Sequence, residues 1–121
     1  MMPCTSVQVW LGNWMGKLGF PEGEEIDEAA IQWAADVDET SRKEIQAFLD
    51  RTETMGITVL FVSNECGLGM TPNYKISRYY RDTIGRINQD ITRRADKVFF
   101  MVAGCAVDVK LLDAQAATLL S

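Results

Sequence analysis

Two short apolar segments constrain the fold of this chain more than any other feature. The first, ITVLFV at residues 57–62, is rich in β-branched residues and apolar at both alternating sets of positions. The second, VFFMV at residues 98–102, is apolar throughout. Strands without polar alternation are typical of a parallel sheet that is covered on both faces. We therefore expect an α/β fold with a small, mainly parallel sheet and flanking helices.

A helical pattern lies between the two segments. Apolar residues recur every three or four positions from Ile76 to Ala95, which predicts an amphipathic helix. A strand, a helix and a second parallel strand form a right-handed βαβ unit. Two strands, even with a third in the first few residues, leave sheet edges with unpaired backbone groups. We therefore expect the chain to be a homo-oligomer or part of something larger.

The segment VQVWLGNWMGKL, residues 7–18, predicts a short buried helix that ends near Gly19. Its GNWMGKL stretch resembles a phosphate-binding P-loop only superficially. Three residues rather than four separate Gly12 from Gly16, and Leu18 stands where the magnesium-binding Ser or Thr belongs. This stretch is therefore not interpreted as a P-loop.

A second apolar stripe runs from Ile26 to Phe48 and predicts a long amphipathic helix that ends at Gly56. Ser41 and Glu44 match a capping box, which indicates a break of this helix near residues 38–41. At the other end of the chain, the tail from residue 105 is expected to be partly irregular, with a short terminal helix in LLDAQAATLL.

Composition limits the classes of function. The chain has 121 residues, 47% of them hydrophobic, and we expect a single domain over residues 1–121. No apolar run approaches the ~18 residues of a membrane span, and the N-terminus lacks the pattern of a signal peptide. Because the chain contains no histidine, histidine-based catalysis is excluded and a conventional zinc site is not expected. Three scattered cysteines indicate free thiols and a cytoplasmic protein.

Charge is distributed unevenly along the chain. The net charge of -5 argues against general nucleic-acid binding. Residues 22–53 carry eleven acidic residues and three basic ones, whereas residues 73–97 carry seven basic and three acidic ones. The basic segment suits an anionic small molecule or an acidic subunit face, and the alternative is a solvated helix surface.

The loop FVSNECGLGMTP, residues 61–72, follows the first strand and precedes the basic helix. Ligands of open α/β sheets bind beyond the carboxyl ends of the strands, and helix N-termini favour anions. The loop and the helix together resemble the bifunctional adenosylcobinamide kinase / adenosylcobinamide-phosphate guanylyltransferase family of cobalamin biosynthesis. The family pattern N-E-V-G-x-G-I-V-P is matched from Asn64 to Pro72, with Cys66, Met70 and Thr71 as departures. The pattern R-x-x-R-D-x-x-G-R-x-N-Q is matched from Arg78 to Gln89, and VWLGNWM resembles the family's mid-chain helix.

The resemblance implies a truncated P-loop-NTPase-like (RecA-like) fold corresponding to the C-terminal two-thirds of the family fold. It also implies a transferase that uses GTP or ATP with Mg²⁺. The family's P-loop and guanylylated histidine are absent from these residues, and the position of its Walker-B-like acid falls near Thr5. We therefore expect no catalytic residues and no activity of the chain alone. By resemblance, the residues that bind nucleotide or substrate are Asn64, Glu65, Gly67, Gly69, Arg78, Arg81, Asp82, Arg86, Asn88 and Gln89.

Structural roles for the same residues remain open. Asp82 stands four positions from both Arg78 and Arg86, where it can form two helical ion pairs worth ~0.3–0.5 kcal/mol each. Asn88 and Gln89 can instead cap the edge of the neighbouring strand or contact a partner.

Three interpretations of function follow. The first is a diverged family member that retains weak nucleotide or cobinamide binding, and the second is a non-enzymatic oligomeric interaction or regulatory module. The third is an enzyme completed by a partner chain that carries the P-loop.

Overall fold

The structure, a computed structural model, describes residues 4–19, 28–64 and 75–120. The chain divides into two compact units, Met1–Asp90 and Ile91–Ser121, and each is described by itself. No described helix is long and apolar enough to cross a membrane.

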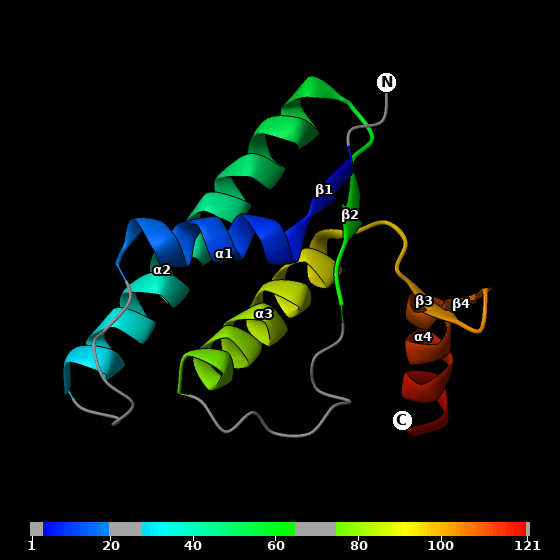
Figure 1. Cartoon of the computed structure of the whole chain (residues 1–121). Helices are drawn as coiled ribbons and strands as arrows, with labels where there is room; N and C mark the ends of the chain where they lie inside the picture. Colours follow the sequence, from blue (N-terminus) through cyan, green and yellow to red (C-terminus); the bar gives the residue numbers. More distant parts are fainter. Residues whose placement is uncertain (1–3, 20–27, 65–74, 121) are drawn as a thin grey trace. The chain divides into compact units, whose positions relative to one another are not determined.

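The first unit joins a parallel strand pair to three helices (Figure 1). Its elements in chain order are β1 (Cys4–Ser6), α1 (Val7–Lys17), α2 (Glu28–Met55), β2 (Leu60–Val62) and α3 (Lys75–Arg94), the last of which runs on past the boundary. Cys4, Thr5 and Ser6 pair with Leu60, Phe61 and Val62 in parallel register. The first few residues of the chain therefore supply a strand beside the 57–62 segment.

The core of this unit lies between the apolar stripes of the helices. Val7, Leu11 and Met15 of α1 recur every four positions and are almost completely buried. The predicted helix over residues 7–18 is therefore confirmed. The buried apolar residues of the two longer helices within this unit are Ala30, Trp33, Val37, Ile45, Ile84 and Ile87.

Aromatic contacts join α2 to its neighbours. The ring of Trp33 lies 6.3 Å from that of Tyr79 on α3, and Phe48 meets Phe61 of β2 edge to face at 5.9 Å. Both separations are within the range at which aromatic pairs add to the energy of burial. The contacts place Phe61, the middle residue of β2, beside α2, and α3 along the same helix.

The predicted break of α2 near residues 38–41 is wrong, because the helix is continuous from Glu28 to Met55. Ser41 is fully buried, and its Oγ donates a hydrogen bond to the carbonyl oxygen of Asp38, 3.2 Å away in the preceding turn. Ser41 therefore acts inside the helix and not as its cap. Burial of Val37, Ser41 and Ile45 on one stripe outweighs the local capping signal.

The predicted βαβ unit is also wrong. β3 (Phe99–Val102) does not continue the sheet of β1 and β2, but pairs antiparallel with β4 (Cys105–Asp108) in a separate two-stranded sheet. The two-residue turn Ala103–Gly104, with φ angles of 50° and 77°, returns the chain so that β4 pairs with β3. Positive φ at both central residues is the geometry of tight hairpin turns. The mainly parallel sheet is thus reduced to one parallel pair and one antiparallel pair.

The 57–62 segment is shorter and more open than expected. Only Leu60–Val62 is a strand, and the side chains of Leu60 and Val62 are 48% and 50% exposed. The sequence predicted a strand that is covered on both faces. Among the described residues, β2 is not covered in this way.

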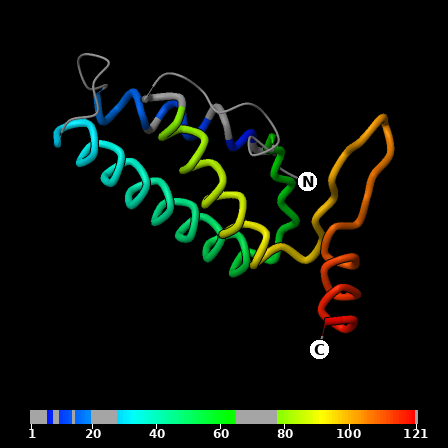
Figure 2. The backbone as a smooth tube through the Cα atoms, turned by 90° about the horizontal axis from the view of Figure 1, so that it is seen from below, coloured from blue at the N-terminus to red at the C-terminus, as the bar shows by residue number. Residues whose placement is uncertain are grey.

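The second unit consists of the hairpin and α4 (Val109–Leu120), which Figure 2 shows in succession along the chain. The tail from Cys105 is a strand rather than irregular, and the predicted terminal helix is confirmed. Asp108 accepts a hydrogen bond from the amide of Leu111 at 3.0 Å, which caps the start of α4. Lys110 Nζ donates to the carbonyl oxygen of Ala95.

We predict opposite effects of alanine at two glycines. Gly56 follows α2 with φ 66°, whereas Gly12 lies inside α1, and an added Cβ meets no atom within 4 Å at either site. Gly56→Ala should lower the free energy of unfolding by about 1 kcal/mol, since left-handed backbone costs an alanine about that much. Gly12→Ala should raise it by roughly 0.5–1 kcal/mol through helix propensity. Urea unfolding measures both, and destabilisation by Gly12→Ala would contradict the prediction.

Candidate functional site

The candidate site lies where β2 ends and α3 passes beside it. Ser63 Oγ donates to Asn88 Oδ1 at 2.5 Å, and Asn88 Nδ2 donates to the carbonyl oxygen of Asn64 at 3.3 Å. Both ends of the Asn88 amide are therefore used on the two residues that follow β2. For Asn88, the structure favours the strand-capping role over direct ligand binding.

This contact fixes the start of the predicted ligand loop. Asn64 is exposed at the carboxyl end of β2, and the loop continues from it. Glu65, Gly67 and Gly69 lie outside the described residues. The Asn88 contact therefore sets the point from which those three residues leave the strand.

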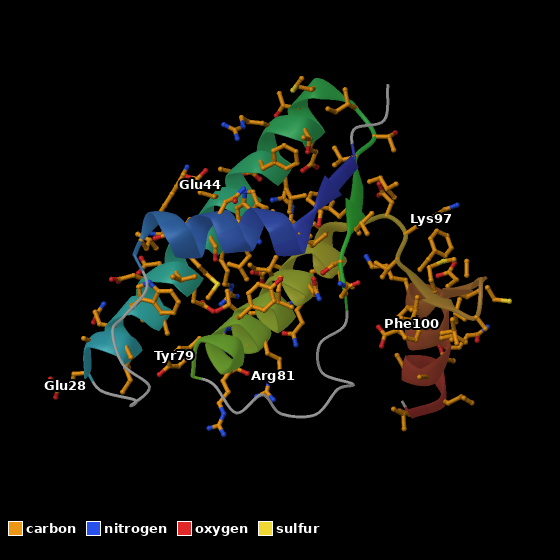
Figure 3. The ribbon with its side chains drawn as sticks, viewed as in Figure 1. Glu28, Glu44, Tyr79, Arg81, Lys97 and Phe100 are labelled. Atoms are coloured by element: carbon orange, nitrogen blue, oxygen red, sulfur yellow. The ribbon has the colours of Figure 1, made fainter. Side chains whose placement is uncertain are left out.

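Charged residues lie nearer the start of α3. Arg78 is exposed, and Arg81 is 28% exposed at its side chain (Figure 3). Arg81 Nε and Nη2 lie 3.3 and 3.2 Å from Oδ1 of the adjacent Asp82, which is 47% exposed. Gln89 is also exposed.

Arg86 takes part in a contact with another helix. Its Nε donates to Asp38 Oδ2 of α2 at 2.5 Å. Asp82 therefore pairs with its neighbour Arg81, and the predicted i,i+4 ion pair between Asp82 and Arg86 is wrong. The carboxylate of α2 competes better for Arg86 because it is only 18% exposed at its side chain and less solvated.

A second contact between α2 and α3 was missed by the sequence analysis. Arg42 of α2 binds Asp90 of α3 through two hydrogen bonds, Nε to Oδ2 at 2.7 Å and Nη2 to Oδ1 at 3.0 Å. The Asp90 side chain is 5% exposed and that of Arg42 is 36% exposed. Arg42 Nη1 also reaches Asp38 Oδ1 at 3.4 Å. Two arginines and two aspartates thus alternate between the helices, and we call these four residues the interhelical charge cluster.

One signal in the sequence does identify this cluster. Asp90 stands three positions after Ile87 and one before Ile91, on the buried stripe of α3. A carboxylate on such a stripe must be paired, because an isolated buried charge is too costly. The sequence therefore requires a cation for Asp90, although it does not say which one.

The electrostatics of the cluster keep Arg42 charged. The hydrogen bonds to Asp90 raise the pKa of Arg42 above its usual value, Asp38 adds to the effect, and desolvation opposes it. Because the pKa of Arg42 is raised in the folded state, the stability that the pair contributes is fully present below the ordinary arginine pKa. It is lost only as the pH rises through the higher pKa of the folded state. The contact is therefore insensitive to deprotonation of Arg42 across the ordinary range of pH.

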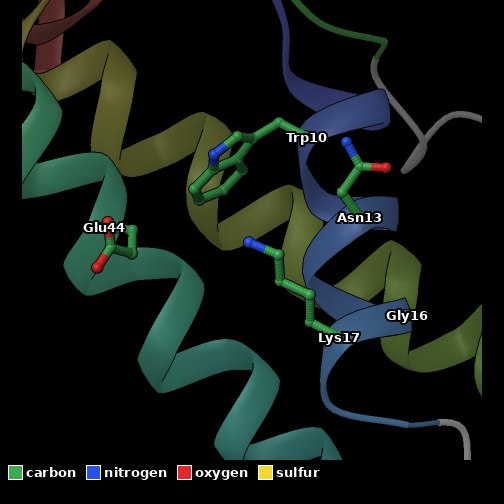
Figure 4. Close-up of a pocket in the computed structure, with 5 residues that line it drawn as sticks. All are labelled: Trp10, Asn13, Gly16, Lys17 and Glu44. Carbon is green, nitrogen blue, oxygen red and sulfur yellow. The ribbon is translucent and has the colours of Figure 1, made fainter.

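A hollow of about 610 Å³ lies apart from this site (Figure 4). Trp10, Asn13, Gly16 and Lys17 of α1 line it together with Glu44 of α2. The stretch GNWMGKL thus belongs to α1, whose backbone N–H groups are engaged in the helix rather than arranged as a phosphate-binding loop. Rejection of a P-loop at this position is confirmed.

Among the described residues, no group of three or more His, Cys, Asp or Glu side chains is arranged to hold a metal ion.

Comparisons with known proteins identify the family. A family model described as "Cobinamide kinase / cobinamide phosphate guanyltransferase" matches residues 4–109. The chain belongs to this family. It is 34% identical over 92 residues to the bifunctional adenosylcobalamin biosynthesis protein CobU of Salmonella typhimurium. Identities over 67 residues are 34% with CobU of Escherichia coli and 37% with the bifunctional protein CobP of Pseudomonas aeruginosa.

These matches cover most of this chain but much less of its relatives. The three alignments span 76%, 55% and 55% of this chain, and 48%, 37% and 39% of the respective relatives. The chain thus spans about half the length, or less, of the family members that it matches. The resemblance inferred from residues 64–72 and 78–89 is confirmed at the level of the family.

We predict that Arg42→Met lowers the free energy of unfolding by about 1.5–2 kcal/mol. The substitution leaves the buried Asp90 carboxylate without its cation. Because Arg42 is 36% exposed, we expect a loss at the lower end of the range measured for hydrogen bonds to charged groups. Lys43→Met is the matched control, because Lys43 pairs with Glu39 on the exposed face of α2 and should not change stability measurably. Equal effects of the two substitutions in urea unfolding would contradict the prediction.

Proposed function

We propose that this chain is a diverged cobinamide kinase/guanylyltransferase homologue that binds a phosphate-bearing nucleotide or cobinamide and does not transfer phosphoryl or guanylyl groups by itself. The observation that supports binding is the exposed Arg78 on α3, the helix whose Asn88 contacts the residues that follow β2. Family membership supports the identity of the ligand class.

The chemistry of α3 suits an anionic ligand. Arg78 is exposed, Arg81 pairs with its exposed neighbour Asp82, and the side chain of Arg86, which pairs with Asp38, is 47% exposed. Arginine binds phosphate through two parallel N–H···O bonds. Gly67 and Gly69 of the preceding loop would allow close approach of backbone N–H groups, and Glu65 would orient a hydroxyl or a metal-bound water.

The chemistry of transfer requires groups that these residues do not contain. Phosphoryl transfer depends on a phosphate-cradling loop, its lysine and an acid that holds Mg²⁺. A covalent guanylyl-histidine intermediate requires a histidine. The 121 residues contain neither the motif GxxxxGK[ST] nor a histidine. The β1–β2 pair and its helices would then contribute ligand contacts as part of a P-loop-NTPase-like fold. A partner chain that carries a P-loop would supply the transfer chemistry.

Calorimetric titration with GTP and Mg²⁺ tests this proposal. We expect saturable binding that weakens about tenfold in Arg81→Ala, the loss of one charged hydrogen-bond partner. Binding should also weaken in Glu65→Ala, whereas Arg51→Ala on the exposed part of α2 should leave the affinity unchanged. A flat titration of the wild type up to millimolar GTP would overturn the proposal. Formation of adenosylcobinamide phosphate well above a blank would overturn its catalytic part.

A second candidate function, an oligomeric interaction module, is favoured by a separate observation. All four residues of β3 are exposed apolar side chains, with Phe99 at 53% and Met101 at 62%, and Leu111 and Leu112 of α4 are exposed by more than half. Exposed apolar side chains in such number are typical of protein–protein contacts.

Sedimentation of the purified chain distinguishes the two candidates. An interaction module predicts an assembly larger than the 13.5 kDa chain, and Met101→Lys should shift it towards monomer because a charge then faces the contact. Ile31→Lys, at a similarly exposed apolar position on α2, is the control and should leave the assembly unchanged. A wild type that stays monomeric at all concentrations tested excludes the second candidate.

A further inference from the structure

The hollow between α1 and α2 has the size of a ligand site. Its volume of about 610 Å³ is within the range of small-molecule sites in proteins. Both helices belong to the first compact unit and contact each other, so the two walls of the hollow have defined positions. None of its lining residues belongs to the candidate site at the end of β2.

The wall that α1 contributes follows from the spacing of its residues. Trp10, Asn13 and Lys17 stand three and four positions apart, so they share one face of the helix. This face is separate from the buried stripe that begins at Val7 and ends at Met15. Trp10 is partly buried, whereas Asn13 and Lys17 are exposed. Figure 4 shows the Trp10 ring and the Lys17 side chain extending from α1 towards α2.

Gly16 leaves room in the same wall. It lines the hollow without a side chain, and a Cβ at this position would meet no atom within 4 Å. The space beside the helix backbone is therefore open, and a larger residue at position 16 would occupy it.

The charges on the two walls are opposite. Lys17 of α1 contributes an ammonium group and Glu44 of α2 contributes a carboxylate. Both side chains are exposed, and Glu44 forms no hydrogen bond or ion pair with another described residue. The two charges therefore line one space without forming an ion pair across it. A ligand that carries a group of each sign can bind both.

The indole ring of Trp10 favours a particular body for such a ligand. An indole face stacks on aromatic rings and offers a large apolar contact area. A ligand with a single charge would be attracted by one of Lys17 and Glu44 and repelled by the other. The lining therefore suits an aromatic zwitterion better than a simple anion or cation.

We propose that this hollow binds a small zwitterion with an aromatic body, such as an aromatic amino acid or a dipeptide that ends in one. Its carboxylate meets Lys17, its ammonium group meets Glu44, and its ring lies on Trp10. Asn13 can both donate and accept a hydrogen bond at the same ligand. The inference goes beyond the proposed function, because it involves neither the arginines of α3 nor a phosphate. Exposed charge pairs contribute little in water, so we expect affinities in the millimolar range.

A titration followed by the indole ¹H–¹⁵N resonances tests this proposal. The probes are L-phenylalanine and glycyl-L-phenylalanine, two zwitterions that hold their charges at different separations. At least one of them should produce a saturable shift of the Trp10 resonance, which is assigned by its disappearance in Trp10→Phe. N-acetyl-L-phenylalanine lacks the ammonium group and L-phenylalaninamide lacks the carboxylate, so both should bind about two- to fivefold more weakly. No saturable shift with either zwitterion, or equal affinities for zwitterions and blocked compounds, would overturn the proposal.

Substitutions assign the two charges. Glu44→Gln should weaken zwitterion binding and remove the discrimination against N-acetyl-L-phenylalanine. Lys17→Met should likewise remove the discrimination against L-phenylalaninamide. Glu39→Gln is the matched control, because Glu39 is an exposed carboxylate on the same helix that pairs with Lys43 and does not line the hollow. If Glu39→Gln changes the affinities as much as Glu44→Gln does, the proposal is wrong.

Gly16→Leu tests the location of the ligand. Leucine would occupy the open space beside α1 and should weaken binding of both zwitterions at least tenfold. Because leucine favours a helix more than glycine does, we expect the fold to be retained. The indole resonances of the other two tryptophans verify this. Unchanged affinity in the folded Gly16→Leu variant places the ligand elsewhere and overturns the proposal.

Discussion

The packing of α3 on α2 depends on the burial of one carboxylate. Asp90 is 4% exposed, on a buried stripe that also contains Ile84 and Ile87, and a charge at that depth is tolerable only with a well-placed partner. Arg42 supplies that partner with two short hydrogen bonds from the facing helix. Apolar stripes can slide past one another at small cost, whereas a bidentate ion pair fixes the register of the two helices.

That register has consequences for the candidate site. With α3 fixed on α2, Arg86 meets Asp38, and Asn88 reaches the two residues that follow β2. The family motif that contains these residues therefore combines different tasks within one helix. Asn88 contacts the residues that follow β2, Arg86 contacts Asp38 of α2, and Arg81 pairs with its neighbour Asp82.

Family membership and fold coverage have to be considered together. The chain matches the family over residues 4–109 but spans about half the length of its relatives or less. The exposed apolar side chains of the strands agree with this partial coverage of the relatives. Leu60 and Val62 of β2 and all four residues of β3 have the composition of covered strands, yet each is 40–62% exposed. Because exposed apolar strands are typical of protein–protein contacts, ligand binding and assembly have to be tested separately.

The sequence by itself determined the family, the helices and the limits on chemistry. The family motif is long, the apolar stripes repeat at helical spacing, and these 121 residues contain no histidine that could carry a transferred group. It did not determine strand pairing, because an apolar strand carries no signal that separates a parallel neighbour from an antiparallel one. The turn at Ala103–Gly104 decided that question for β3. Nor could it pair Asp38 with Arg86 or Asp90 with Arg42, residues 48 positions apart. Helical periodicity shows which face of a helix is buried, but only tertiary packing decides which charge on a second helix lies opposite.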